Sequence, residues 1–245
     1  RKFKRFVDRY KGDYRAKKMT CWEQFIAIFL GQLGNCSSLR EIESTIKFHA
    51  NEHYHLGLRG NIARSTLANA NETRDWRIYR DIFFDLIGNL KLSEQSQTRD
   101  LVKIIDSTAI PLKFNQHQWA EKNNVFCGIK THVVFNLNEK MPTYFTFTPA
   151  NVSDVKEARK LELEAGCTYV LDRGYLDFNW LKEINDAKAF FVTRLKKNSA
   201  VIALSKIQVT NETISSQIIE FSRKWNNYGV LNTYHKKPVR KVIVQ

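Results

Sequence analysis

Hydrophobic positions recur at helical spacing through the first part of the chain. Between residues 20 and 34 the apolar side chains define one helix face: Trp22, Phe25, Ile26, Phe29, Leu30 and Leu33. Thr20 predicts the N-cap of this helix and Gly34 its end. A second helix is predicted from Ser38, because Glu41 three residues later completes a capping-box pattern. Residues 64–71 and 72–90 predict two more helices, and residues 49–61 a loop.

The pattern changes to strands after a polar, aperiodic stretch at residues 91–99. Apolar runs rich in β-branched and aromatic residues predict strands at residues 101–106, 125–137, 143–148, 168–172 and 189–195, with more strands after residue 200. Residues 156–165 and 178–186 predict helices. The order is typical of a mixed α/β sheet. We therefore expect an all-α domain at residues 1–97 and an α/β domain at residues 98–245.

Charge is concentrated at the two ends of the chain. The net charge is +14, of which residues 1–20 carry +7 and residues 221–245 carry +6. Basic ends favour a polyanionic partner such as nucleic acid, although a solvated surface explains them equally well. No apolar run approaches the ~18 residues that a membrane helix needs, so no membrane partner is expected. The first residue is not Met, so we expect that the start of the protein is missing.

The four cysteines are scattered and form no C-x-x-C pair, which argues against a zinc or redox motif. Reduced thiols of this kind fit the cytoplasm.

Short helices joined by tight turns in the first domain are typical of helix-turn-helix-like DNA-binding modules. Five polar residues around residues 59–69 are candidate DNA contacts: Arg59, Arg64, Ser65, Thr66 and Asn69. A plain helical bundle explains the pattern equally well.

Two aspartates follow apolar strands in the second domain. Asp106 stands in the motif IIDST and Asp172 in the motif LDRGY, each at the end of the apolar strand that leads into it. A charge at the end of a buried strand needs compensation, and a divalent metal ion shared by two carboxylates would provide it. Such a pair is the arrangement that two-metal phosphoryl transfer requires. Structural roles are the alternative: Asp106 could cap the next turn, and Asp172 could pair with Arg173.

Residues 99–198 resemble the catalytic domain of insertion-sequence DDE transposases, the branch whose third acid lies in a Y-x2-R-x3-E-x6-K signature. The matching motifs are IIDST at 104–108, GIKTH at 128–132, TPANVSD at 148–154, LDRGY at 171–175 and FVTRLK at 191–196. The helical front resembles the N-terminal domain of such proteins through SLREI at 38–42, HLGL at 55–58 and RSTLANAN at 64–71. Each motif is weak alone, but their order and spacing are specific.

The resemblance implies a ribonuclease-H-like sheet, with Asp106 on its first strand and Asp172 on its fourth as catalytic ligands of Mg²⁺ or Mn²⁺. It also implies further residues near this site: Lys130, His132, Asn151, Asp154, Arg173, Tyr175 and Arg194. Of these, Lys130, Arg173 and Arg194 are predicted to hold DNA phosphates. Tyr175 either stacks on a displaced base or packs. The implied partner is double-stranded DNA, at transposon ends and targets, bound by two or more copies of the protein in the bacterial nucleoid.

The third acid of the family has no counterpart here. Residues 173–245 contain no Y-x2-R-x3-E-x6-K match, Glu183 follows Asp172 too soon, and Glu212 and Glu220 lie among the predicted later strands. We therefore expect a C-terminally truncated transposase with little or no activity of its own. The alternatives are a nuclease of the same fold, which cuts without joining, and a non-catalytic DNA-binding remnant.

Overall fold

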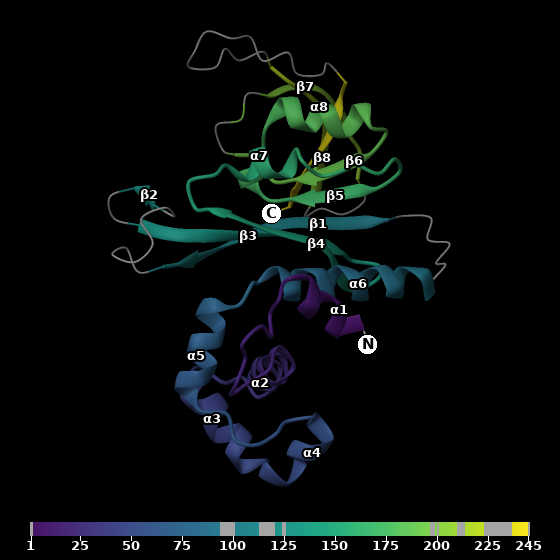
Figure 1. The fold of residues 1–245 in the computed structure, drawn as a ribbon. Helices are drawn as coiled ribbons and strands as arrows, with labels where there is room; N and C mark the ends of the chain where they lie inside the picture. Colours follow the sequence, from purple (N-terminus) through teal and green to yellow (C-terminus); the bar gives the residue numbers. More distant parts are fainter. Residues whose placement is uncertain are drawn as a thin grey trace. The chain divides into compact units, whose positions relative to one another are not determined.

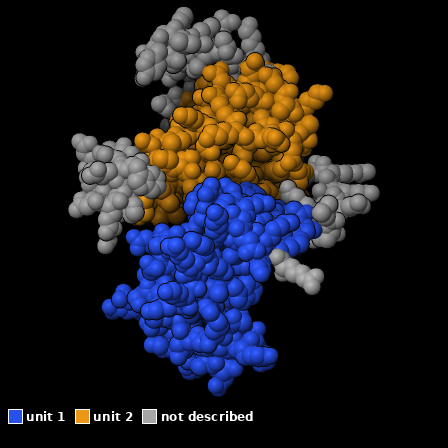
Figure 2. Space-filling model, viewed as in Figure 1, with its two compact units in different colours: residues 1–95 blue, residues 96–245 orange. Residues whose placement is uncertain are grey.

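The chain divides into two compact units, residues 1–95 and residues 96–245 (Figure 2). The computed structural model describes residues 2–93, 101–112, 121–123, 126–196, 199, 201–209, 214–222 and 237–244. Within these ranges, neither unit has a helix that is both long and apolar enough to cross a membrane.

The N-terminal unit is helical (Figure 1), as its hydrophobic spacing predicts. Its elements are α1 (Lys2–Arg9), α2 (Cys21–Leu33), α3 (Leu39–Phe48), the 3₁₀ turn η1 (Ala50–Glu52), α4 (His53–Leu56), α5 (Arg64–Thr73) and α6 (Arg77–Ser93). One hydrophobic cluster packs α2, α3 and α5 around Ile26, Ile46 and Leu67. A second cluster joins Val7 of α1 to Ile78 of α6.

The predicted N-termini of α2 and α3 are confirmed by their caps. The Thr20 side chain accepts the Glu23 N–H, and the Glu23 carboxylate accepts the Thr20 N–H at 2.7 Å, which completes a capping box. Ser38 caps α3 by accepting the Glu41 N–H. The Glu41 carboxylate accepts the N–H of Ser37 instead of that of Ser38. These contacts satisfy N–H groups that have no partner within the helix.

Two predictions for this unit are wrong. Residues 49–61, predicted as a loop, contain η1 and α4. The boundary between the helices predicted at residues 64–71 and 72–90 lies later, because α5 runs to Thr73 and Arg74 is extended (φ −83°, ψ 146°) before α6 begins. The Arg74 guanidinium donates to the carbonyl oxygens of Met19 and Thr20 and to the side-chain oxygen of Gln24. We attribute the break to these bonds, which helical spacing does not reveal.

The second unit contains the mixed sheet that the sequence predicts. Its strands are β1 (Val102–Pro111), β2 (Glu121–Asn123), β3 (Phe126–Asn136), β4 (Met141–Pro149), β5 (Thr168–Leu171) and β6 (Phe190–Thr193). β1, β3 and β4 form an antiparallel meander, and β5 and β6 add in parallel on the other side of β1. A three-stranded antiparallel sheet contains β7 (Val201–Ile207), β8 (Ile214–Phe221) and β9 (Val239–Val244) (Figure 1).

Helices α7 (Asp154–Ala158) and α8 (Phe178–Asp186) pack with the main sheet, and the 3₁₀ turn η4 (Arg173–Tyr175) follows β5. Ala158 and Trp180 share one core with Ile105 of β1. The helix predicted over residues 156–165 begins two residues early and is much shorter. Leu161 and Leu163 both pack against the core. Residues two positions apart point to different sides of a helix, so both can reach the core only because this segment is not helical.

A buried carboxylate ties α2 to the segment before α5. The Glu23 side chain is only 4% exposed and accepts hydrogen bonds from the Arg59 backbone N–H and guanidinium at 2.8–3.1 Å. Burial alone would raise the pKa of Glu23, but hydrogen bonds from Arg59 and Thr20 outweigh it and hold this pKa at about 2. The predicted DNA contact Arg59 therefore has its charge compensated within the unit.

We expect Glu23→Gln to lower the free energy of unfolding of this unit by about 2 kcal/mol near neutral pH, because charge-assisted bonds are replaced by neutral ones. In the unmodified protein this stabilisation is present above the unfolded-state pKa of about 4.3 and is lost as the pH falls toward the folded-state value. Urea unfolding measures the stability of each protein near neutral pH and at about pH 3. The free energy of unfolding should fall less between these two pH values in Glu23→Gln than in the unmodified protein. Glu43→Gln, which breaks the more exposed pair with Lys47, is the control and should change stability by less than about 0.5 kcal/mol. The same acid-induced loss in Glu23→Gln and in the unmodified protein would contradict this assignment.

Candidate active site on the main sheet

The pairing of β1 with β5 brings two aspartates side by side. The parallel ladder ends at Ile105 with Leu171, and its offset is 66 residues throughout. Asp106 and Asp172 come next on their strands and are separated by the same 66 positions. Paired residues of neighbouring strands lie on the same face of a sheet. The two aspartates therefore lie on neighbouring chain segments, directly after the last paired residues of β1 and β5.

The surroundings of Asp106 differ from the prediction. β1 does not end at this residue, because β3 pairs with it as far as Pro111 and has Val133 opposite Asp106. Asp172 does follow the end of β5, where its carboxylate accepts the Gly174 N–H and caps η4. Both aspartates are exposed. Water therefore reaches both carboxylates, although each aspartate follows a buried residue of its strand.

Asp154 connects β1, β3 and the start of α7. Its carboxylate accepts hydrogen bonds from Ser107 Oγ at 2.9 Å and Lys130 Nζ at 3.0 Å. Lys130 also donates to the Val152 carbonyl at 2.8 Å. The side chains of Lys130 and Asp154 are only 13% and 21% exposed, so their ion pair is better shielded than an ordinary surface pair. We call Ser107, Lys130, His132 and Asp154 the Asp154 network.

His132 is the buried, neutral member of this network. Its Nε2 atom shares a hydrogen bond with Thr148 Oγ1 at 2.8 Å, and its Nδ1 atom lies 3.9 Å from Asp154 Oδ1. Burial lowers the pKa of the imidazole, and the charge of Asp154 opposes this without reversing it. The ring is therefore uncharged at neutral pH and acts through packing and the bond to Thr148.

Tyr175 links the Asp154 network to the two aspartates. The residue is 1% exposed, and burial raises the pKa of its phenol. The negative charges of three carboxylates raise this pKa further: Asp154, Asp106 and Asp172. The hydroxyl has no hydrogen bond of good geometry to a described residue, although Ser107 is close enough to act on its pKa. Such burial favours packing over stacking on a displaced base.

Three further predicted residues lie on the exposed rim. Arg194 comes directly after the last pair of β5 with β6, Leu171 with Thr193, so it continues the row that contains Asp172. Arg173 is exposed in η4, and Asn151 is exposed in the turn after β4. With the described residues, neither arginine forms an ion pair, so both can meet a phosphate. Arg59 and Arg64 belong to the N-terminal unit, where Arg64 is exposed in the first turn of α5.

Sequence reasoning missed the parts played by Ser107, Thr148 and Gly174. A Cβ atom at Gly174 would lie 3.0 Å from Asp172 Oδ1 and 3.3 Å from Asp154 Oδ2, so glycine lets both carboxylates approach this turn. All three residues stand inside the motifs IIDST, TPANVSD and LDRGY. Their presence in those motifs was the feature of the sequence that could have identified them as part of the site.

Asp106 and Asp172 fit a hard divalent cation. Both offer exposed carboxylate oxygens, and Mg²⁺ is typically bound by one or two carboxylates together with water and phosphate oxygens. Asp154 is engaged by Ser107 and Lys130 and is not a free third ligand. Over the described ranges, no group of three or more His, Cys, Asp or Glu residues could hold a metal ion. The pair would therefore form an open site completed by other oxygen ligands.

This arrangement matches a known family. Residues 97–242 match the model of the transposase DDE domain, and residues 1–59 match a domain of unknown function, DUF4372. The first match covers more than half of the chain, so the chain belongs to the transposase DDE domain family. The ribonuclease-H-like fold class that the sequence predicts is confirmed, as a mixed sheet with flanking helices and a helical N-terminal region.

One curated protein and one solved structure that the chain resembles are described as transposases. A Sinorhizobium fredii protein, the proposed transposase y4zB, is 39% identical over 132 residues, which are 54% of this chain and 37% of that protein. A cryo-EM structure of a piggyBac transposase synaptic complex with hairpin DNA is 11% identical, with a TM-score of 0.34, over 66% of this chain and 41% of that one. The structural likeness is too distant to indicate function. The chain spans less than half the length of either protein.

The shielded ion pair of the Asp154 network can be tested by a double-mutant cycle. We expect Lys130→Met and Asp154→Asn each to destabilise the second unit by about 2 kcal/mol. The double variant should be more stable, by about 1–2 kcal/mol, than the sum of the two single effects predicts. Urea unfolding of the three variants gives this coupling energy. The exposed pair Lys182–Asp186 is the control, with expected coupling below about 0.5 kcal/mol. Additive effects at Lys130 and Asp154 would show that this pair contributes no interaction in solution.

Proposed function

We propose that the protein is a DNA transposase, which cuts DNA at the ends of a mobile element and joins the freed 3′-hydroxyl to target DNA. The observation that carries the proposal is the pairing of β1, β5 and β6, whose parallel ladders end one residue before Asp106, Asp172 and Arg194. Both reactions are in-line attacks on a phosphodiester, and paired carboxylates beside a cation suit them. Membership of the transposase DDE domain family supports the same reaction class.

In this proposal Asp106 and Asp172 hold Mg²⁺ or Mn²⁺ through their carboxylate oxygens. When bound, the metal supplies charge stabilisation to the attacking and leaving oxygens. Arg173 and Arg194 hold backbone phosphates through charge-assisted hydrogen bonds, so that the scissile bond stays aligned with its nucleophile. The proposed substrates are duplex transposon ends and target DNA.

The Asp154 network would position this site. Lys130 was predicted as a phosphate contact, but its ammonium group already binds Asp154 and the Val152 carbonyl. These bonds favour a positioning role for Lys130, since Asp154 in turn binds Ser107, the residue after Asp106. Asn151, exposed in the turn after β4, is proposed to lie along the DNA path.

A third acid is part of the proposal. The resemblance to insertion-sequence transposases implies a glutamate in a Y-x2-R-x3-E-x6-K signature, and the printed sequence contains no match after Arg173. We therefore expect the 245-residue chain to bind metal weakly and to have little catalytic activity by itself. We also propose that two or more copies assemble on DNA to pair the element's ends, in the nucleoid of a bacterial cell.

Removal of either aspartate should weaken metal binding. We expect Asp106→Asn and Asp172→Asn each to weaken Mn²⁺ binding at least about tenfold, because each removes one of two ligands from an open site. Electron paramagnetic resonance of free Mn²⁺ measures this in the 245-residue chain without requiring activity. Asp186→Asn, at an exposed position of α8, removes the same charge, and this variant should bind Mn²⁺ like the unmodified protein. Unchanged Mn²⁺ affinity in both site variants would contradict the proposed metal site.

A joining assay separates the three candidate functions. The DNA would be a plasmid target with labelled oligonucleotides that carry the sequences flanking the gene, in the presence of Mn²⁺. A transposase that includes the third acid should give joined products that Asp106→Asn abolishes. Nicked plasmid without joining would identify a nuclease. DNA binding that is indifferent to both aspartates, without any product, would identify a non-catalytic remnant.

A further inference from the structure

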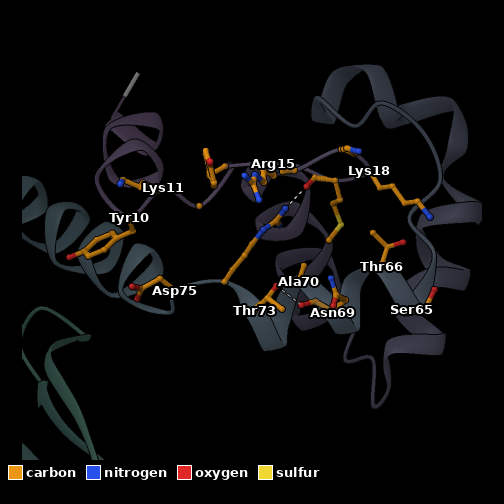
Figure 3. Close-up of a pocket in the computed structure, with 16 residues that line it drawn as sticks. Tyr10, Lys11, Arg15, Lys18, Ser65, Thr66, Asn69, Ala70, Thr73 and Asp75 are labelled. Carbon is orange, nitrogen blue, oxygen red and sulfur yellow. Dashed lines mark hydrogen bonds between the residues drawn. The ribbon is translucent and has the colours of Figure 1, made fainter.

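The N-terminal unit contains a hollow with a basic lining, the basic cradle. It has a volume of about 670 Å³ and lies between residues 10–19 and α5 (Figure 3). Residues 10–19 contribute four cations to its wall: Lys11, Arg15, Lys17 and Lys18. The whole cradle belongs to one unit, so its shape does not depend on the other.

The four cations carry uncompensated charge. All are exposed, and no described carboxylate forms an ion pair with any of them. The cations of α1 are different: Lys2 and Arg5 pair with Asp85, and Arg9 pairs with Asp81, both on α6. The acid in the lining, Asp75, is held by Arg77 at 2.5 Å. A positive field therefore remains in the cradle and attracts anions.

The segment that carries these cations has a fixed conformation. Lys11 and Arg15 have φ angles of 50° and 59°, a region that residues other than glycine seldom adopt without support. Arg74 supports the segment by binding the carbonyl oxygens at its end, and Asp13 accepts the Cys21 N–H at 2.6 Å. The backbone that carries the cations is thus ordered before a ligand arrives, which lowers the entropy loss on binding.

The opposite wall adds neutral hydrogen-bonding groups. Ser65, Thr66 and Asn69 of α5 line the cradle across from the basic segment (Figure 3). Ala63, the N-cap of α5, has no side-chain acceptor for the first N–H groups of the helix. Lys and Arg together with hydroxyl, amide and helix N-terminal groups are the donors that contact DNA phosphates.

We propose that the basic cradle binds the sugar–phosphate backbone of double-stranded DNA. The choice of ligand rests on the proposed transposase function, whereas the choice of surface rests on the charge and rigidity of residues 11–18. Four cations on one short segment suit a row of phosphates better than one small anion. The cradle would hold duplex DNA largely without regard to its sequence, because phosphate contacts position a protein on DNA without reading its bases.

The test is DNA binding by the 245-residue chain, measured as fluorescence anisotropy of a labelled mixed-sequence duplex over a series of salt concentrations. We expect the double variant Lys17→Gln/Lys18→Gln to bind about tenfold more weakly, with the slope of log K against log salt reduced by about 2. The double variant Lys4→Gln/Lys47→Gln removes the same charge from the same unit outside the cradle, and should keep most of the affinity. Asn69→Ala should weaken binding about threefold without changing the slope, because it removes a hydrogen bond but no charge.

The outcomes separate this proposal from the proposed function. Equal affinities and slopes for the two double variants, both folded by circular dichroism, would overturn the cradle and leave the Mn²⁺ result at Asp106 and Asp172 unaffected. Tighter binding of the labelled single strand than of the duplex would overturn the choice of ligand. If the unmodified chain binds no duplex DNA at all, the cradle fails together with the DNA-substrate part of the proposed function.

Discussion

The parallel pairing of β1 with β5 is the contact on which the candidate active site depends. A slip of one residue would shift Asp172 along its strand by about 3.3 Å relative to Asp106 and turn it to the other face of the sheet. Burial fixes the register: Ile105 and Leu171 are each 3% exposed, and both lie in the core with Trp180 of α8. The hydrophobic core therefore determines which polar residues meet at the rim, although it contains neither aspartate.

Some charged side chains are paired within the protein, and others are left free to bind a ligand. Glu23, Asp81 and Asp154 each bind cations and hold helices or strands together. The formal charge of the chain therefore overstates what is available to a ligand. In the first twenty residues, Lys2, Arg5 and Arg9 of α1 are paired with acids of α6, while no described carboxylate pairs with the cations between α1 and α2. A count of Lys and Arg in the sequence does not distinguish these two segments. Only the contacts in the structure show which cations are paired within the unit and which are available to a ligand.

Short-range features of the fold were predictable from sequence, and tertiary ones were not. The caps at Thr20 and Ser38 depend on residues three positions away, so their pattern is visible in the chain. The break at Arg74 depends on carbonyl groups more than fifty residues earlier. Strand β1 shows the same limit, since its apolar run ends at Asp106 while pairing with β3 continues. For the candidate site, the motifs indicated which residues to consider, but which of them are bonded to one another required the structure.

The difference in exposure between the aspartate pair and the Asp154 network has a physical meaning. Asp106 and Asp172 are exposed like charges on neighbouring strands, and like charges repel unless a cation lies near them. The Asp154 carboxylate already has its cation in Lys130 and a hydroxyl donor in Ser107. An incoming cation therefore gains more at the exposed pair, where it displaces no existing ion pair, than at Asp154, where it would have to displace Lys130. The shielded network can hold its geometry while the rim stays open to a metal ion and a phosphate, which is the separation that a site for bulky polyanionic DNA requires.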